Sequence, residues 1–257
     1  MSIAPPQRRY SAPALDKGID ILECLSEARM PRSQLEIGKT LKRTPGEIYR
    51  MLMCLEERGY VVREPGSGKF RLTLRLYELG HRQHALTLLR EAARLPMEEL
   101  AEKTGQGCHL SVQYGPSLLV LMERMPARRI CLAVTEGTML PMVETSSGML
   151  LISRLKDKEV RELLDNDSQY RSLTRHKRSD FLGAVENVRK RGFLVKTSEL
   201  NEGVTDIAVP VGVAGTDTAS VLAVSYLAIR GQDATRACCE LTLRSAARIN
   251  ENLGITP

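Results

Sequence analysis

The sequence predicts an α+β protein in two domains: an N-terminal winged helix-turn-helix and a C-terminal domain on an antiparallel sheet. Three observations carry this prediction. Two helix-start signals, "SQLE" at 33–36 and "TPGE" at 44–47, stand close together. A turn-rich segment, "EPGSG" at 64–68, then separates two short runs of β-type residues. Beyond residue 105, strand-like and helical segments come in blocks of their own kind.

The first helix is expected over 14–28, where four apolar residues recur at helical spacing and define one face: Leu15, Ile19, Leu22 and Leu25. The second helix starts at a capping box, in which Ser33 caps an amide and Glu36 reaches back. That helix is short and ends near Lys42. These two helices are the first half of the helix-turn-helix.

The third helix begins at a second capping box, with Thr44 as the cap, Pro45 at the first helical position and Glu47 three residues after the cap. Its core face is expected to consist of Ile48, Met51, Leu52 and Leu55. Gly59 follows as a stop signal. The runs 60–63 and 69–73 then read as a β-hairpin, which completes a winged helix-turn-helix.

The remaining chain is expected to alternate blocks of strands and helices. Residues 74–105 are mostly helical, with Pro96 as a break. Strands are expected at 108–115, 117–125, 129–137, 205–213 and 220–229, and helices at 146–155, 157–166, 178–192 and 233–254. The resulting domain plan is a disordered arm (1–12), a winged helix-turn-helix (13–74), a linker helix (75–90) and an α+β domain (91–257).

Composition narrows the class of protein. Residues 1–80 hold 14 Lys and Arg against 10 Asp and Glu, and the rest 23 against 21, so most of the net charge of +6 lies in the first third. Six Cys without a CxxC pair are typical of reduced thiols in a cytoplasm. No apolar run reaches the ~18 residues that span a bilayer, and no secretory signal is visible. We therefore expect a cytoplasmic protein without membrane contact.

The outer face of the helix at 44–58 distinguishes a core helix from a DNA-reading one. Gly46, Arg50, Met53 and Glu57 lie opposite the core face, with Tyr49 on the flank. Gly46 lowers helix propensity by about 1 kcal/mol relative to Ala, which has a use where a backbone must approach another surface. In helix-turn-helix domains the first residues of the second helix of the motif meet base edges. This pattern favours double-stranded DNA as the partner over protein contact alone.

Several residues are predicted to contact DNA. We expect Arg50 to contact a base, and Lys69 and Arg71 on the hairpin to contact the backbone. The full predicted set is Arg43, Thr44, Gly46, Glu47, Tyr49, Arg50, Arg63, Lys69 and Arg71.

An ordered set of segments resembles the IclR-type bacterial transcription regulators. "ALDKGIDILECL", "TPGEIYRMLMCLEERGYVVR" and "FRLTLRLYELG" resemble their winged helix, and "GQGCHLSV", "LPMVETSSGMLL", "GVTDIAVPV" and "VLAVSYL" resemble their effector domain. The resemblance implies a GAF-like C-terminal domain that binds a small metabolite, often a carboxylate. It also implies homodimers through the N-terminal region and often homotetramers.

The resemblance also implies an effector site with this chain's own departures. The predicted set is Met142, Ser146, Ser147, Gly148, Lys196, Asp206 and Ser225. Asp206 replaces the usual Cys, Ala223 lacks a hydroxyl, and Lys196 stands where many relatives have an acidic residue. "TSSGM" either cradles a ligand carboxylate or is a plain helix cap. Asp206 disfavours an anion unless protonated or paired; it either pairs with Lys196, accepts from a ligand hydroxyl, or lies at the surface.

Other constellations carry less weight. Cys108 and His109 are neighbours on a strand, so their side chains point to opposite faces and form no dyad. His81 and His84 lack a third metal ligand at suitable spacing. The basic run at 171–180 reads as a solvated loop. We therefore expect no catalytic residue, no metal and no cofactor.

Three functions remain in competition. The first is a transcription regulator whose operator affinity responds to an organic acid or aromatic carboxylate. The second is an enzyme that uses the winged helix for assembly, against which the absence of a usable catalytic set argues. The third is a DNA binder whose pocket is filled by its own side chains. The sequence does not reveal the effector, the operator, or whether the outcome is repression or activation.

Overall fold

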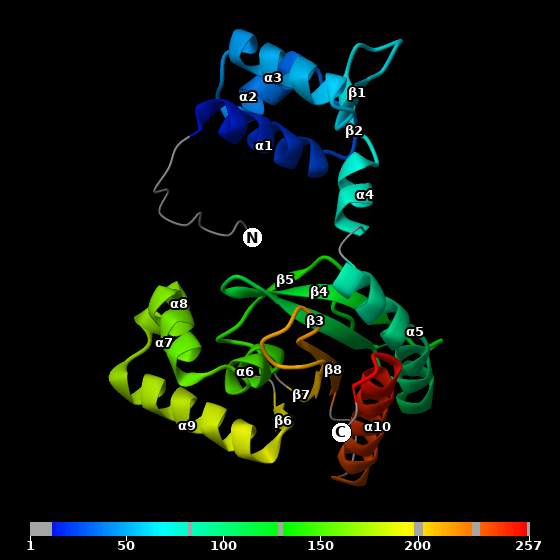
Figure 1. The fold of residues 1–257 in the computed structure, drawn as a ribbon, viewed down its shortest axis with the longest axis vertical. Coiled ribbons are helices and arrows are strands. Elements are labelled where there is room, and N and C mark those ends of the chain that lie inside the picture. Colours follow the sequence, from blue (N-terminus) through cyan, green and yellow to red (C-terminus); the bar gives the residue numbers. More distant parts are fainter. Residues whose placement is uncertain (1–11, 82–83, 128–130, 198–202, 228–231, 256–257) are drawn as a thin grey trace. The chain divides into compact units, whose positions relative to one another are not determined.

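A computed structural model describes residues 12–81, 84–127, 131–197, 203–227 and 232–255 (Figure 1). The chain divides into two compact units between residues 83 and 84. The predicted arm (1–12) lies outside the described residues except for its last position, as do residues 82–83 of the predicted linker.

The first unit has the predicted order of elements. Its helices are α1 (Pro13–Ser26), α2 (Gln34–Leu41), α3 (Pro45–Glu57) and α4 (Arg75–His81), and its hairpin is β1 (Val61–Arg63) with β2 (Phe70–Leu72). The hairpin is antiparallel, and Arg32 adds an isolated bridge to Phe70. One core joins α1, α2, α3 and the hairpin, with Ile21, Ile37, Ile48 and Leu52 fully buried.

The buried face of α1 differs from the predicted one. Of the predicted face, Leu25 is buried and Leu22 packs against the core, but Leu15 is 63% exposed and Ile19 43%. Ile21 and Cys24 are buried instead of these two. Both sets satisfy helical periodicity, so the spacing of apolar residues did not distinguish them. Packing against α2 and α3 selects the second set.

The second unit is built on one six-stranded sheet. Its strands are β3 (Cys108–Tyr114), β4 (Ser117–Arg124), β5 (Met139–Pro141), β6 (Leu194–Thr197), β7 (Val204–Val211) and β8 (Ser220–Leu227). Their order is β5-β4-β3-β8-β7-β6, and every neighbouring pair is antiparallel. The predicted α+β class with an antiparallel sheet is confirmed.

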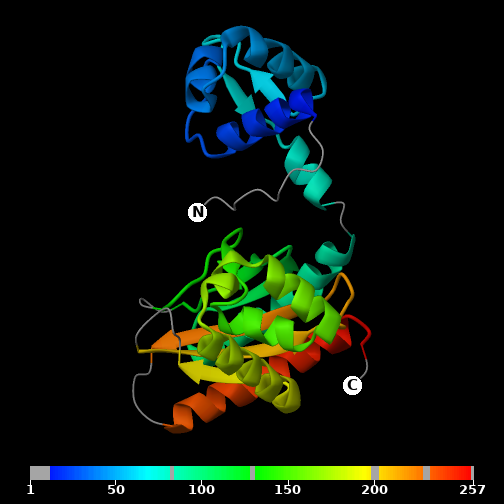
Figure 2. The same cartoon turned by 90° about the vertical axis from the view of Figure 1, so that its left-hand side faces the viewer.

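Helices cover both faces of this sheet. The long helices α5 (His84–Thr104) and α10 (Gln232–Asn252) pack together and against one face. The other face carries α6 (Ser146–Ser153) and α9 (Arg175–Arg191), beside α7 (Asp157–Asn166) and α8 (Ser168–Ser172) (Figures 1 and 2). Along β8, Leu222 belongs to the α5/α10 core and Ala223 to the α6/α9 core, as strand alternation requires.

Three predicted elements were wrong. Residues 131–135 of the expected strand 129–137 form no strand, and β5 lies further on. An apolar run looks the same whether it pairs or lines a cavity wall, as Leu132, Ala133 and Val134 do. The expected loop 171–180 contains the end of α8 and the start of α9, whose cap is Thr174. Pro96 lies inside α5 without ending it, and residues 84–90 belong to that helix rather than to a separate linker.

Candidate DNA interface and candidate ligand cavity

The start of α3 is held by a capping arrangement. The Glu47 carboxylate accepts hydrogen bonds from the Thr44 amide (3.1 Å) and the Thr44 hydroxyl (2.9 Å). Lys17 on α1 adds a third donor at 2.7 Å. The Lys17 hydrogen bond, followed by those from Thr44, lowers the pKa of Glu47 to about 2. Thr44 and Glu47, both predicted to contact DNA, are therefore engaged in positioning the helix.

Arg43 is held in the same way. Its guanidinium lies 2.6 Å from the Asp20 carboxylate, and both side chains are about three-tenths exposed. Its Nε is buried without a hydrogen-bond partner among the described residues. The pairs Arg43–Asp20 and Lys17–Glu47 both connect α1 to the start of α3, so they orient α3 within its unit.

The outer face of α3 presents Gly46, Tyr49 and Arg50. Tyr49 is 50% exposed, and Gly46 and Arg50 are also exposed. No hydrogen bond or ion pair to Arg50 occurs within the part of the chain that the structure describes. A Cβ at Gly46 would meet no atom within 4 Å, so packing inside the unit does not require glycine there. Met53, expected on this face, is half-buried and packs against the core.

The hairpin carries the other predicted cations. Lys69 lies 3.7 Å from Glu36, and Arg71 lies 3.6 Å from Glu64. Exposed pairs of this kind contribute little to stability, so a phosphate can replace the carboxylate. Arg63 instead donates to the Gly68 carbonyl at 3.2 Å and lies over the Phe70 ring, which shapes the turn.

A cavity of about 1190 Å³ lies between the sheet and the helices α6, α8 and α9 of the second unit. Of the predicted effector residues, Ser146, Ser147, Lys196, Asp206 and Ser225 line it. Residues that the sequence reasoning missed also line it, and they include His109, Glu144, Thr145, Met149, Gln169, Lys177, Asp180 and Phe181. A cavity of this size suits a small organic ligand.

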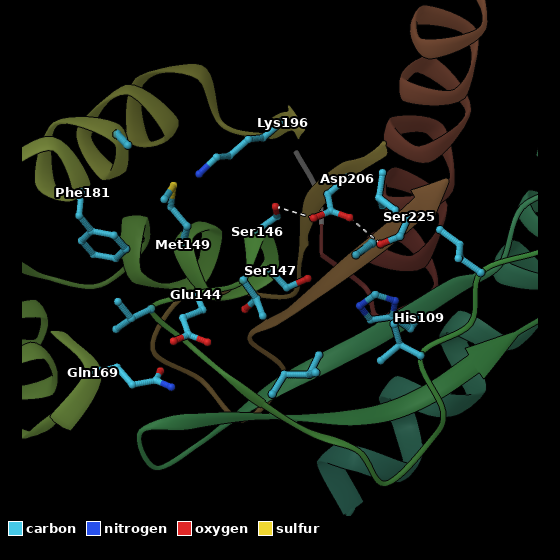
Figure 3. Close-up of a pocket in the computed structure, with 18 of the residues that line it drawn as sticks. His109, Glu144, Ser146, Ser147, Met149, Gln169, Phe181, Lys196, Asp206 and Ser225 are labelled. Carbon is cyan, nitrogen blue, oxygen red and sulfur yellow. Dashed lines mark hydrogen bonds between the residues drawn. The ribbon is translucent and has the colours of Figure 1, made fainter. Parts of the chain in front are cut away.

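Asp206 on β7 is the centre of a hydrogen-bond cluster (Figure 3). The Ser146 hydroxyl donates to Oδ2 at 2.9 Å, and the Ser225 hydroxyl donates to Oδ1 at 2.7 Å. Ser146 is the first residue of α6, and Ser225 stands opposite Asp206 in the β7–β8 register. The cluster therefore connects two strands and a helix across 60 residues of sequence.

Lys196 is the cross-strand partner of Asp206 in the β6–β7 register. Its side chain extends over the cavity, away from the Asp206 carboxylate (Figure 3). Three further charged groups line the cavity: Glu144 and Asp180 add carboxylates, and Lys177 adds an ammonium. The lining is thus of mixed charge.

Met142 and Gly148 do not line the cavity. Met142 is fully buried in the core beneath α6. A Cβ at Gly148 would lie 2.0 Å from the Met142 carbonyl oxygen, so glycine is needed for close approach of two backbones. The Gly148 amide donates to the Thr145 hydroxyl at 3.1 Å. The Gly148 amide therefore serves the helix cap, while a ligand contact by the other amides of "TSSGM" stays a prediction.

His109 contributes a buried polar group that the sequence reasoning set aside. Its side chain is 5% exposed and borders the cavity, while Cys108 packs in the opposite core, as strand alternation predicted. Burial lowers the pKa of His109 to about 4, against the opposing effect of the Asp206 charge. The imidazole is therefore neutral at pH 7, with one donor and one acceptor nitrogen. Burial raises the pKa of the Cys108 thiol to about 12.

The described residues contain neither a metal-binding group of side chains nor a membrane-spanning helix. No group of three His, Cys, Asp or Glu side chains in the described part of the chain is placed to hold a metal ion. No helix among these residues is both long and apolar enough to cross a membrane.

A winged helix-turn-helix followed by a domain with a ligand-sized cavity defines a DNA-binding regulator as the class of protein. The family model described as "Bacterial transcriptional regulator IclR C-terminal" matches residues 83–250, and the "IclR helix-turn-helix domain" model matches 14–65. The chain belongs to the IclR family of DNA-binding transcription regulators.

Individual relatives agree with this assignment. The regulator XynR of Escherichia coli is 28% identical over 225 residues, which cover 86% of this chain and 88% of XynR. KdgR of the same organism is 29% identical, with 76% and 74% covered. An IclR homolog from Microbacterium hydrocarbonoxydans, solved in complex with 4-hydroxybenzoate, has the same fold at a TM-score of 0.77, with 20% identity and coverage of 94% and 99%.

Proposed function

We propose that this protein regulates transcription by binding operator DNA through α3 and that a small organic acid in the cavity changes its operator affinity. It acts as a ligand-responsive binder rather than as an enzyme. The observation that carries the DNA-binding half is the division of labour at α3. Its start is tied to α1 by ion pairs, whereas Gly46, Tyr49 and Arg50 are left for an external surface.

The proposed DNA contacts follow from this exposure. Arg50 reads a base, because a guanidinium without an internal partner is available for a two-pronged contact. Lys69 and Arg71 contact phosphates, since their exposed carboxylate partners are easily exchanged. Arg43 and Glu47 act indirectly, because their ion pairs with α1 fix the orientation of α3 within its unit.

The proposed effector site is the cavity of the second unit. Its volume and its mixture of apolar and polar lining residues, some of which belong to the α6/α9 core, fit a small ligand. The 4-hydroxybenzoate complex of a similarly folded homolog supports a small organic acid as the class of effector. A ligand changes operator affinity only if it binds the DNA-competent and DNA-incompetent forms unequally.

We further propose a homodimer, or a tetramer of such dimers, that pairs through the first unit. Apolar side chains are exposed there on α1, on α2, on α4 and just before α4: Leu15 at 63%, Leu35 at 69%, Tyr77 at 64% and Leu74 at 81%. Exposed apolar groups in such number mark protein contact surfaces. Light scattering of wild type and of Leu15→Ser tests this proposal, and an unchanged mass would contradict pairing through α1.

The decisive test of the DNA-binding proposal compares Arg50→Ala with wild type. The operator is first recovered by sequencing genomic fragments that the purified protein retains. A base contact predicts a loss of about 1–3 kcal/mol on the operator and a much smaller loss on random DNA. Arg58→Ala is the matched control, because Arg58 is exposed at the other end of α3. Equal losses on both DNAs would reduce Arg50 to a phosphate contact.

A further inference from the structure

The three side chains of the Asp206 cluster offer hydrogen-bond acceptors to the cavity and no donor. Each serine hydroxyl has a single hydrogen, and Ser146 and Ser225 both direct it to the Asp206 carboxylate. Both hydroxyl oxygens are left with only lone pairs, which accept hydrogen bonds. An ionised carboxylate likewise has acceptor sites and no donor. All three side chains line the cavity. This part of the cavity wall therefore presents acceptors and no donor.

Neighbouring side chains add only neutral donors to this part of the wall, and one of these is the Ser147 hydroxyl, which follows Ser146 on α6 and lines the cavity. Ala223, which precedes Ser225 on the same face of β8, has no polar atom to offer. His109 is neutral at pH 7 and supplies at most one N–H. The Lys196 ammonium extends away from Asp206 (Figure 3). A ligand carboxylate placed against Asp206 would meet like charge, with only neutral donors beside it to compensate.

We propose that Asp206 is a specificity residue that selects effectors bearing a hydroxyl group, so that the ligand is a hydroxylated organic acid rather than a simple carboxylate. The ligand hydroxyl donates to the carboxylate of Asp206. The ligand carboxylate lies away from it, on the side of the cavity where Lys196 projects. This inference rests on the proposed function of the cavity and adds the chemistry that distinguishes one acid from another.

The test uses the full-length protein and pairs of acids that differ in hydroxylation. The probes are benzoate with 4-hydroxybenzoate, propionate with lactate, and hexanoate with gluconate, each titrated by calorimetry. A charge-assisted hydrogen bond predicts that wild type binds the hydroxylated member of at least one pair about 10-fold or more tightly. Asp206→Asn, which keeps the size of the side chain and replaces one acceptor with a donor, is expected to lose that preference.

Asp217→Asn is the control, because it removes the same charge from an exposed loop outside the cavity. It should keep the wild-type preference. Thermal unfolding checks that each variant is folded. The preference of wild type for hydroxylated acids is measured without any variant, so it tests the proposal even if a variant does not fold.

The outcomes separate the two proposals. If acids bind but no hydroxylated member is preferred, or if Asp206→Asn keeps the preference, the specificity role is wrong and the effector site stands. If no acid binds to wild type, the effector site fails, and the specificity role with it. Operator binding is measured independently of both.

Discussion

At the residue scale, Gly46 leaves the surface of α3 open to an external partner, although glycine lowers the stability of the helix. It lies in the first turn of α3, exposed, and no atom of the chain would touch a Cβ there. Glycine in a helix is less favourable than alanine by up to about 1 kcal/mol. No packing contact among the described residues compensates, which supports the proposal that this surface of α3 approaches DNA.

Gly46→Ala therefore separates folding from binding. We expect the free energy of unfolding of the first unit to rise by up to about 1 kcal/mol and operator affinity to fall, because the methyl group blocks close approach. Chemical denaturation and operator titration measure the two effects. A variant that is more stable and binds as well as wild type would show that α3 does not approach DNA through Gly46.

His109 predicts a pH dependence of stability. Its pKa is about 4 in the folded chain, below the ordinary 6.5. Because the unfolded chain binds a proton that the folded chain does not, stability is full above about pH 6.5 and is lost as the pH falls toward 4. The loss is at most about 3 kcal/mol.

His109→Gln removes this contribution without introducing a charge. Scanning calorimetry of the second unit's transition at pH 7 and pH 4.5 should show a smaller loss for the variant than for wild type. Other titrating groups cancel in the difference. Equal losses in the two proteins would mean that His109 is not buried in its neutral form.

At the scale of the element, α6 depends on one backbone contact. Its Gly148 lies against the backbone of Met142, and its cap is the Thr145 hydroxyl. This contact fixes the position of Ser146 and Ser147 on the cavity wall, since both belong to the same turn. The start of α6, predicted either to cradle a ligand carboxylate or to be a plain helix cap, thus also places two side chains on the cavity wall.

Two matched glycines test this role. Gly148→Ala places a Cβ 2.0 Å from a carbonyl oxygen and should destabilise the second unit by about 3 kcal/mol or more. Gly183→Ala in α9 meets no atom within 4 Å and should stabilise it by up to about 1 kcal/mol. Thermal unfolding of both variants measures these changes in stability. If Gly148→Ala does not destabilise the second unit, the contact between Gly148 and Met142 does not fix the position of α6.

For the whole molecule, the cores of the two units share no residue. The first unit packs around Ile48 and Leu52, while the second has one core on each face of its sheet. In the proposed function, an effector bound in the second unit alters operator binding by shifting the balance between DNA-competent and DNA-incompetent forms. By linkage, the factor by which an effector alters operator affinity equals the factor by which the operator alters effector affinity.

Leu52→Ala tests the independence of the two units. Leu52 is fully buried, so its truncation should destabilise the first unit by about 2–5 kcal/mol and weaken operator binding. Titration of 4-hydroxybenzoate or gluconate into the variant should give the wild-type Kd. A parallel loss of acid binding would contradict separate cores.

Features that depend on neighbouring residues in the chain were predictable from the sequence, whereas features that depend on distant residues were not. Capping boxes, turn residues and strand alternation are local, and they sufficed for the winged helix, the α+β class and the opposite faces of Cys108 and His109. Which of two apolar faces α1 buries, and whether 131–135 pairs as a strand, depends on distant neighbours. Periodicity contains no information about those neighbours.

The candidate site shows the same division. The resemblance of the sequence to the IclR family implied Ser146, Ser147, Lys196, Asp206 and Ser225, which line the cavity, but left open what Asp206 bonds to. Only the tertiary structure, by setting β8 beside β7 and the start of α6 above them, brought both serine hydroxyls to the two carboxylate oxygens. Hydrogen-bond polarity is a property of groups that meet in space, and these groups meet only when the sheet is complete.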